Sequence, residues 1–363
     1  MPSIQIVLLY CRPGFEPECA SEFAQRCADL DVAGYPRFQP DQGYVEFHLF
    51  EEALPVLQRL AFQKLIFTRQ WFAALPLLQD LPVKDRITPL AEQAVYLPQA
   101  SELVAETPDT TEGRELSTLA RKLGSALANH LRQQGVLLPR QHTSPWRLHL
   151  FVLSGREMWL GVSPLANSSA QDRGILRLKF PAQAPSRSTL KLEEAWHQFI
   201  PRQEWDARVG GGKRAADLGA APGGWTWQLV QQGMFVDAVD NGPMQAELME
   251  SGQVVHRRED AFLYRPDKPL DWMVCDVVDK PIKVTERMID WALEGWCQEM
   301  IFNLKLPMKQ RFKEVELCLD RLRQALKEEG KRFRLQAKHL YHDREEITCH
   351  LDLRKLDPLD KQR

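Results

Sequence analysis

The stretch ADLGAAPGGWTWQLV (residues 216–230) places three glycines and a proline between a short apolar run and an amphipathic one. Glycines let a backbone approach a ligand closely, so this stretch is a candidate cofactor loop. A dinucleotide site is a poor match, because Pro222 removes an amide donor that a pyrophosphate would need. A P-loop is also a poor match, because Trp225 stands where the phosphate-binding lysine belongs.

Three acidic residues at the ends of successive predicted strands favour a cationic ligand. Asp217 lies beside the loop, Asp240 ends the next strand, and Asp260 follows the third. S-adenosylmethionine carries a sulfonium, an ammonium and a ribose, and an acid about 20 residues after such a loop meets a ribose in this topology. We therefore predict this cofactor rather than an acid-capped helix without a ligand. The predicted cofactor-binding residues are Ser188, Asp217, Gly219, Ala221, Pro222, Gly223, Gly224, Asp240, Asp260 and Asp276.

The elements around this loop are predicted to form an α/β domain over residues 181–363. Strands are expected in RAADL, MFVDAVD, QVVHR, DWMVCDV, MIFNLKL, RFRLQAKHL and EITCHLDL, with helices between them. Such alternation predicts a doubly wound, Rossmann-like sheet with its ligands at the carboxyl ends of the strands. The Pro- and Ser-containing PAQAPSRS (181–188) is the expected linker before it.

The amino-terminal half predicts a different, α+β architecture. Residues 1–76 follow the order β-α-β-β-α-β of a ferredoxin-like subdomain. Residues 77–180 form a second predicted subdomain, with an amphipathic helix that ends at Gly135 and a hairpin made by RLHLFVL and MWLGVS.

The charge pattern is uneven although the net charge of the 363 residues is only -2. Residues 114–147 hold six basic side chains and one acidic one, and residues 301–340 hold eleven and five. Two basic segments are compatible with a polyanion that lies across two domains, and equally with two solvated helix faces. The candidate RNA-binding residues are Arg121, Lys122, Arg132, Arg140 and Arg147.

The motif DLGAAPGGWTWQL resembles the first motif of the S-adenosylmethionine-dependent ribose 2'-O-methyltransferases, which include the heat-shock RNA methyltransferase. That group shares a Lys-Asp-Lys-Glu tetrad. The resemblance implies Lys191 in SRSTLKLEE, Asp276 in MVCDVVDKP, and Lys305 in FNLKLP. The glutamate is in REEITCHL, where Glu346 fits better than Glu345. One departure is DVVDKP, which is two residues longer than the Asp-Met-Ala-Pro pattern of the heat-shock enzyme.

The amino-terminal half resembles the THUMP RNA-binding arrangement. Together with SRSTLKLEEAW, DLGAAPGGWTWQLV and VDNGPM, it makes essentially the whole chain similar to the bacterial 23S ribosomal RNA (cytidine 2'-O)-methyltransferase M family. The resemblance implies methylation of a cytidine ribose in the peptidyl-transferase region, with ribosomal RNA as the partner in the cytoplasm. The seven cysteines form no C-x-x-C pair and have no His at metal spacing, so we expect no metal, and no apolar run approaches the length of a membrane span. A monomer is favoured while the oligomeric state stays open.

Methyl transfer to a ribose hydroxyl requires a base, because the alcohol must lose its proton as it attacks. A lysine with its ordinary pKa near 10.4 is protonated at neutral pH, and burial and a second ammonium would lower that pKa. Our hypothesis is that Lys305 is the base, that Lys191 and Asp276 orient it and the hydroxyl, and that Glu346 positions the lysines.

Several alternatives stand beside this hypothesis. Cys275 could be the nucleophile of a base methyltransferase, but its neighbour Asp276 points to the opposite side of a strand, so a packed thiol is favoured. Trp225 and Trp227 could stack on a base, although core packing is preferred. A THUMP-bearing tRNA methyltransferase that acts on a base is a second possible enzyme. A non-catalytic RNA-binding assembly factor is the alternative outside enzymes.

Overall fold

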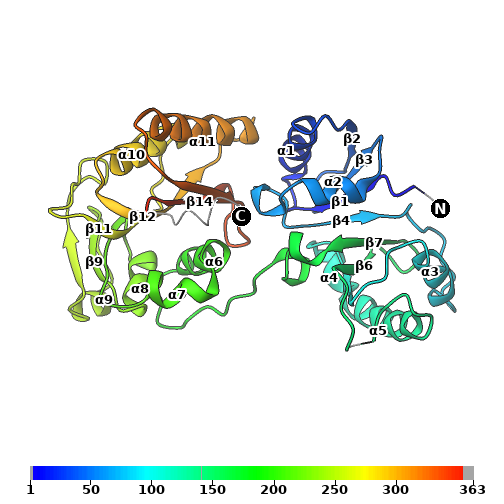
Figure 1. Cartoon of the computed structure of the whole chain (residues 1–363). Helices are drawn as coiled ribbons and strands as arrows, with labels where there is room; N and C mark the ends of the chain where they lie inside the picture. Colours follow the sequence, from blue (N-terminus) through cyan, green and yellow to red (C-terminus); the bar gives the residue numbers. More distant parts are fainter. Residues whose placement is uncertain (1–2, 140, 355–363) are drawn as a thin grey trace. The chain divides into compact units, whose positions relative to one another are not determined.

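The chain folds into two compact units, Met1–Leu176 and Arg177–Arg363 (Figure 1). A computed structural model describes residues 3–139 and 141–354, so Arg140 lies outside the described residues. The units divide four residues before the predicted linker at 181–188. None of the helices in the described part of the chain is long and apolar enough to cross a membrane.

The first unit is built on a seven-stranded sheet with the order β2-β3-β1-β4-β7-β6-β5. Its strands are β1 Ile6–Tyr10, β2 Gly34–Arg37, β3 Tyr44–Leu49, β4 Gln70–Ala74, β5 Glu102–Glu106, β6 Trp146–Val152 and β7 Met158–Pro164. Its helices are α1 Glu16–Ala28, α2 Ala53–Arg59, α3 Ile87–Ala94, α4 Thr111–Glu115 and α5 Ser117–Gln133, with short 3-10 turns η1 Phe62–Lys64, η2 Leu165–Asn167 and η3 Asp172–Gly174. The first four strands and α1 and α2 have the predicted ferredoxin-like order, which is confirmed.

This sheet curls over on itself. Tyr10 of β1 stacks on Phe151 of β6 with ring centroids 4.6 Å apart, although β4 and β7 separate the two strands in the sheet. Figure 1 accordingly shows β1 and β4 above β7 and β6, with α1 and α2 outside one layer and α3 and α5 outside the other. The two predicted amino-terminal subdomains therefore share one continuous sheet and one aromatic core.

The long amphipathic helix predicted in this unit is interrupted at Leu116, where α4 ends and α5 begins. Helix α5 buries Leu123, Leu127 and Leu131, as its periodicity predicts. The chain leaves the helix through Gly135, whose φ of 73° is the left-handed conformation of a helix end.

The second unit is a doubly wound sheet with the order β10-β9-β8-β11-β12-β14-β13. Its strands are β8 Arg214–Leu218, β9 Phe235–Val239, β10 Val254–Arg257, β11 Leu270–Cys275, β12 Cys297–Lys305, β13 Arg334–Lys338 and β14 Glu346–Asp352. Its helices are α6 Thr189–Phe199, α7 Trp205–Val209, α8 Gly224–Gln231, α9 Ala246–Glu250, α10 Pro281–Leu293 and α11 Arg311–Glu328, with a 3-10 turn η4 Arg202–Glu204. This confirms the predicted Rossmann-like architecture.

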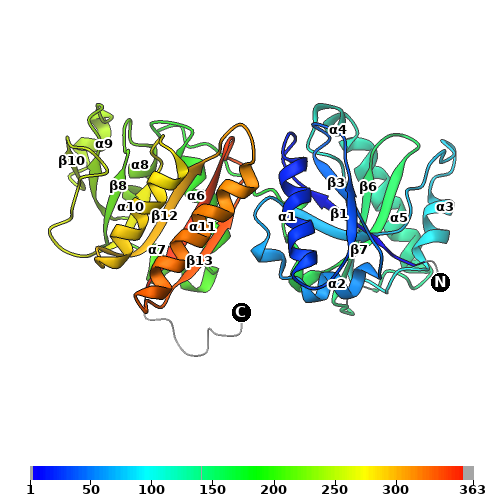
Figure 2. The same cartoon turned by 90° about the horizontal axis from the view of Figure 1, so that it is seen from above.

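Helices cover both faces of this second sheet. Figure 2 shows α10 and α11 side by side over it, and Figure 1 shows α6 and α8 on the opposite face. Strands β10, β9, β8, β11 and β12 run parallel, whereas β14 is antiparallel to both β12 and β13. The carboxyl ends of the parallel strands and the first residue of β14 consequently meet at one edge of the sheet.

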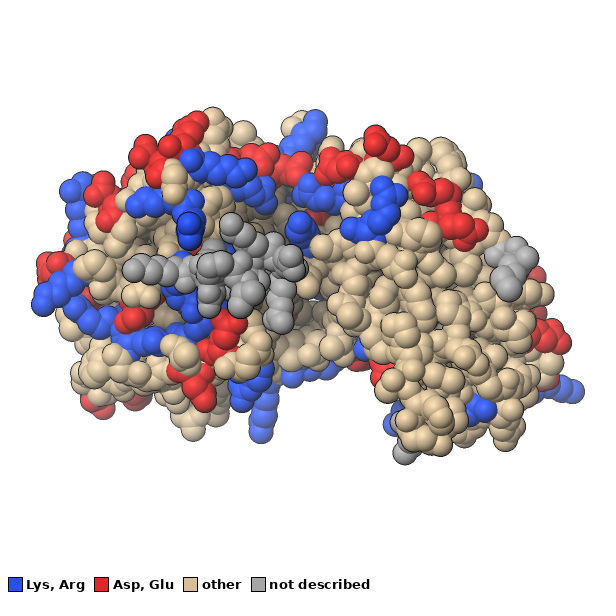
Figure 3. Space-filling view, viewed as in Figure 1, with Lys and Arg blue, Asp and Glu red and all other residues tan. Residues whose placement is uncertain are grey.

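Charged side chains of both signs are mixed on the face that Figure 3 shows. In the view of Figure 3, Lys and Arg are interspersed with Asp and Glu rather than gathered on one broad basic face. A polyanion that binds this face would therefore contact local groups of bases.

Candidate active site

Four elements bring the predicted tetrad to one edge of the second sheet. Asp276 directly follows β11, and Lys305 ends the neighbouring parallel strand β12. Glu346 begins β14 and pairs with Lys305 in the antiparallel register. Lys191 lies in the first turn of α6. Residues separated by up to 155 positions in the chain therefore meet because of strand order and register.

The four side chains form a cluster of alternating charge. The Nζ atom of Lys191 lies 3.1 Å from Asp276 Oδ2, and the Nζ atom of Lys305 lies 2.5 Å from Asp276 Oδ1. Both lysines also contact Glu346, Lys191 at Oε1 and Lys305 at Oε2. Each carboxylate is thus shared by the same two ammonium groups, which neutralises the cluster and fixes all four side chains.

The geometry distinguishes the two neighbouring glutamates. Glu346 is buried and contacts the lysines, whereas Glu345 is exposed and pairs with Arg311 at 2.7 Å. The residue preferred from the sequence is therefore the one that the structure brings into the cluster.

The two lysines differ in their surroundings. Burial acts to lower the pKa of Lys191, but attraction by Asp276 and Glu346 outweighs it and raises that pKa. The expected net lowering of a lysine pKa is therefore wrong for Lys191, because the two carboxylates outweigh the effect of burial. Its side chain is 15% exposed and that of Lys305 is 22% exposed, so Lys305 is the more accessible of the two.

A buried series of hydrogen bonds behind the tetrad was not predicted from the sequence. Asn303 donates its amide to Asp276 Oδ1 at 2.9 Å, and the Thr348 hydroxyl donates to Asn303 Oδ1 at 2.8 Å. Thr348 also lies 3.0 Å from Asp343, whose pKa is raised well above its ordinary value by burial and by Glu346. The Thr348 hydroxyl has one hydrogen, so if that hydrogen goes to Asn303, a protonated Asp343 can donate to the Thr348 oxygen.

A sequence signal for Asn303 does exist. It stands two residues before Lys305 in an apolar strand, and residues two apart on a strand point to the same side. An amide in such a position must find a partner, and here that partner is the aspartate of the tetrad.

Glu194 links the helix of Lys191 to the loop before β14. Its carboxylate accepts the backbone amides of Tyr341 and His342 at 2.8 and 2.9 Å, and it also contacts the imidazole of His342 at 2.6 Å. Because Glu194 lies one helical turn after Lys191, this contact fixes α6 against the segment that leads to Glu346.

The predicted cofactor loop is tightly enclosed. A Cβ on Gly219 would lie 2.7 Å from Val277 Cγ1, and one on Gly224 would lie 2.2 Å from Ser188 Oγ. Gly219 and Gly223 have φ angles of 80° and 117°, which favour glycine. The close approach of Ser188 to Gly224 places this predicted residue beside the loop, while Pro222 is exposed on it.

The predicted cofactor acids have different environments. Asp217 is buried and accepts a hydrogen bond from the Thr226 hydroxyl at 2.6 Å, and burial raises the pKa of Asp217 to about 7. Asp240 accepts the amides of Ala221 at 3.0 Å and Gly242 at 2.7 Å, so it holds the loop directly.

Asp260, the third of these acids, is exposed and accepts the amide of Phe262 at 2.8 Å. Acidic groups around a glycine loop without a phosphate-binding lysine fit a cationic cofactor such as S-adenosylmethionine better than a nucleoside phosphate.

Two alternative roles receive no support from the geometry. Cys275 is buried, and burial raises the pKa of its thiol to about 12, so it is not a ready nucleophile. Trp225 packs in the core and donates its indole NH to the Ser188 carbonyl at 2.9 Å. Trp227 is partly buried against a second apolar cluster.

The predicted RNA-binding residues do not lie together as a set. Arg121 and Lys122 are exposed on α5 and Arg132 is half-buried there. Arg147 is buried on β6, where its Nε atom donates to Glu102 at 2.5 Å. The prediction that Arg147 is part of an exposed basic face is therefore wrong, because its guanidinium is used inside the unit. Arg140 lies outside the described residues.

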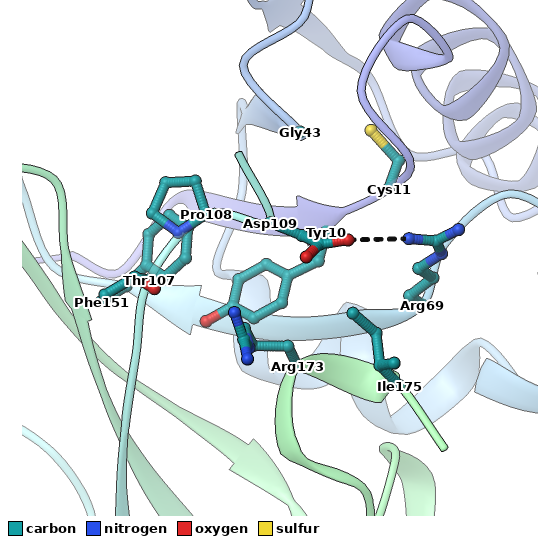
Figure 4. Close-up of a pocket in the computed structure, with 10 residues that line it drawn as sticks. All are labelled: Tyr10, Cys11, Gly43, Arg69, Thr107, Pro108, Asp109, Phe151, Arg173 and Ile175. Carbon is teal, nitrogen blue, oxygen red and sulfur yellow. Dashed lines mark ion pairs between the residues drawn. The ribbon is translucent and has the colours of Figure 1, made fainter. Parts of the chain in front are cut away.

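A pocket lies in the first unit, and its lining residues all come from that unit, whereas the tetrad lies in the second. Figure 4 shows Tyr10, Arg69, Asp109 and Arg173 among its lining residues, with the ion pair between Arg69 and Asp109 at 3.6 Å. Arg69 directly precedes β4 and Asp109 follows β5, so this ion pair links two strands that are not neighbours in the sheet. Across residues 3–139 and 141–354, no group of three or more His, Cys, Asp or Glu side chains is placed to hold a metal ion.

The fold and the cluster define the class of protein as a methyltransferase, since residues 184–352 match the model of the FtsJ-like methyltransferases. Residues 4–72 match the RlmM ferredoxin-like domain, and residues 85–164 match the N-terminal domain of ribosomal RNA large subunit methyltransferase M. The chain belongs to the ribosomal RNA large subunit methyltransferase M family. A methyltransferase of this class uses S-adenosylmethionine as its cofactor.

Relatives of this family match the chain over nearly its whole length. The protein named ribosomal RNA large subunit methyltransferase M from Cellvibrio japonicus (strain Ueda107) is 52% identical over 351 residues, which are 95% of this chain and 98% of the relative. That from Dickeya chrysanthemi (strain Ech1591) is 50% identical over 348 residues, which are 95% of each chain. The chain is thus an enzyme of ribosomal RNA methylation.

The hydroxyl of Thr348 is expected to control the methyl-transfer rate through Asn303. Thr348→Val leaves Asn303 Oδ1 buried without its donor and frees the amide to turn from Asp276, so the single-turnover rate should fall roughly 10- to 100-fold. Thr348→Ser keeps the hydroxyl and should stay within about threefold of the wild type. The Km for S-adenosylmethionine should change little in both variants. Equal rates in the Val and Ser variants would contradict this role.

Proposed function

We propose that the chain transfers a methyl group from S-adenosylmethionine to a ribose 2'-hydroxyl of 23S ribosomal RNA. The observation that carries the proposal is the cluster in which Lys191 and Lys305 share both Asp276 and Glu346 at the carboxyl edge of the sheet. The resemblance described from the sequence supports a cytidine in the peptidyl-transferase region as the target. The cytoplasm, where ribosomal RNA is processed in bacteria, is its proposed place of action.

In this proposal Lys305 removes the proton of the ribose hydroxyl. S-adenosylmethionine supplies a methyl group bound to a positively charged sulfur. The ribose oxygen would form its bond to the methyl carbon as the carbon–sulfur bond breaks, and the hydroxyl proton would pass to Lys305. Lys305 is the more exposed lysine, which supports its role as the group that meets the RNA. Lys305 accepts this proton only in its neutral form, so the ammonium that pairs with Asp276 and Glu346 must release a proton before the transfer.

The other members of the tetrad hold the base in place. Burial acts to lower the pKa of Lys191, but attraction by Asp276 outweighs it and the pKa is raised. This raised pKa supports a permanently charged ammonium. Asp276 would orient Lys305 and the hydroxyl, and Glu346 would keep the two lysines at a fixed spacing. Orientation of this kind is a large part of the acceleration in a displacement between two bound reactants.

The cofactor would be held by the loop after β8 and by the acids around it. Asp240 is the proposed partner of its ribose, Asp260 that of its adenine, and Asp217 would attract its positive groups. The remaining proposed contacts are Ser188, Gly219, Ala221, Pro222, Gly223, Gly224 and Asp276. A cation next to Asp217 would favour its ionised form, which burial disfavours in the free protein.

The first unit would hold the RNA. We assign residues 1–76 to a ferredoxin-like subdomain and 77–180 to a THUMP-like subdomain, on the shared sheet described above. Arg121, Lys122 and Arg132 of α5 are the proposed contacts to RNA phosphates, since the first two are exposed and Arg132 is half-buried on the same helix. Such contacts would add affinity without reading the sequence.

Neutralising the α5 face should weaken RNA binding in a salt-dependent way. With Arg121, Lys122 and Arg132 all changed to Gln, the slope of log affinity against log salt should become shallower by about 2. The control changes Arg59, Lys64 and Lys84 to Gln, three exposed bases of the same unit. An unchanged slope, or an equal change in the control, would show that the α5 face does not bind RNA.

The reaction itself is tested by locating the transferred methyl group. The protein is incubated with labelled S-adenosylmethionine and unmodified 23S ribosomal RNA or tRNA, and the RNA is then hydrolysed in alkali. Alkaline cleavage needs a free 2'-hydroxyl, so a ribose methyl leaves the label in an alkali-resistant dinucleotide from 23S ribosomal RNA. Label in mononucleotides would place the methyl on a base, and label only in tRNA would contradict the proposed substrate.

A further inference from the structure

Two exposed apolar side chains stand on the loops that leave the tetrad strands. Val278 is 88% exposed and Met308 is 93% exposed, the highest values among the large hydrophobic side chains of the described residues. Val278 comes two residues after Asp276, and Met308 comes three residues after Lys305. Single exposed apolar residues are ordinary on a protein surface, but both of these lie on loops that begin at the tetrad.

The loop 277–280 is held at both ends. Val277 packs against the cofactor loop, where a Cβ on Gly219 would lie 2.7 Å from Val277 Cγ1. At the other end, Asp279 accepts the amide of Lys280 at 2.7 Å and the ammonium of Lys283 at 2.6 Å, at the start of α10. Val278 therefore lies between two anchored residues, and its exposure follows from the path of the loop.

The loop 306–310 is anchored in a similar way. The amide of Leu306 donates to the Glu345 carbonyl at 2.8 Å, and Arg311 at the start of α11 pairs with the Glu345 carboxylate at 2.7 Å. Gln310 enters α11 with a φ of 57°. Met308 therefore lies on a short loop between two points that are both tied to Glu345, the neighbour of the tetrad glutamate.

Basic side chains accompany the two apolar ones. Lys280 and Lys309 are exposed on the same loops. Asp279, next to Lys280, is already paired with Lys283, and Glu345, which anchors the loop of Lys309, is paired with Arg311. Each loop therefore presents one apolar and one positively charged side chain, the combination that suits a base and a phosphate.

We propose that these two loops form a nucleotide clamp, in which Val278 and Met308 pack on the bases at the target site and Lys280 and Lys309 pair with the flanking phosphates. The clamp rests on the proposed function, because the tetrad fixes where the ribose hydroxyl lies and its base and phosphates must lie beside it. The clamp also gives a role to the two extra residues of DVVDKP, which lengthen the loop that carries Val278.

The apolar half of the clamp is tested by Val278→Ser combined with Met308→Ser. The Km for 23S ribosomal RNA should rise about tenfold, because the variant loses apolar surface that is buried only when RNA binds. Cofactor affinity and Tm should stay as in the wild type, since neither side chain is buried in the free protein. The matched control is Leu317→Ser, which removes a 57% exposed apolar side chain from α11 of the same unit.

The basic half is tested by Lys280→Gln combined with Lys309→Gln, for which the salt slope of RNA binding should become shallower by about 1 to 2. An unchanged Km in the serine variant, or an equal rise in the Leu317→Ser control, would overturn the apolar half. An unchanged salt slope would overturn the basic half. A wild-type protein that places no label on a ribose would contradict the proposed function instead, so the two failures are distinguishable.

Discussion

The sharing of two carboxylates by two lysines is the interaction on which the organisation of the second unit depends. Asp276 and Glu346 each contact both Lys191 and Lys305, and all four side chains are largely removed from solvent. Removing one member of a buried ionic group leaves an uncompensated charge, which costs about 3 to 5 kcal/mol in measured cases. The cluster is therefore stable only as a whole. The helices and strands that carry the four side chains must hold them within hydrogen-bonding distance of one another.

The fold meets this demand with a second layer of polar contacts. Asn303 and Thr348 connect Asp276 to the interior, and Glu194 fixes the helix of Lys191 to the loop before β14. The antiparallel strand β14 matters for the same reason, because its register sets Glu346 opposite Lys305. The predicted cofactor loop is positioned differently, because its glycines allow Val277 and Ser188 to approach the backbone closely.

Much of this could be predicted from local sequence, and the remainder could not for identifiable reasons. The alternation of strands and helices and the ferredoxin-like order follow from periodicity, and both are confirmed. The curling of the first sheet depends on aromatic contacts between distant strands, which no local pattern reports. The prediction that Arg147 is exposed was wrong because the sequence shows its charge but not its pairing with Glu102. Asp217 was recognised as a strand-end acid, but its burial against Thr226 depends on tertiary packing.

The role of Lys305 as the base is tested most directly by Lys305→Ala, with methyl transfer and cofactor binding measured on the same preparation. Lys313→Ala, which removes an exposed lysine from α11, is the control. Loss of a positioned general base costs about 100- to 10,000-fold in rate, so the rate of single-turnover transfer to 23S ribosomal RNA should fall by at least about 100-fold. Calorimetric affinity for S-adenosylmethionine should remain measurable in a folded variant. Transfer at the rate of the wild type would contradict the assignment of Lys305 as the base.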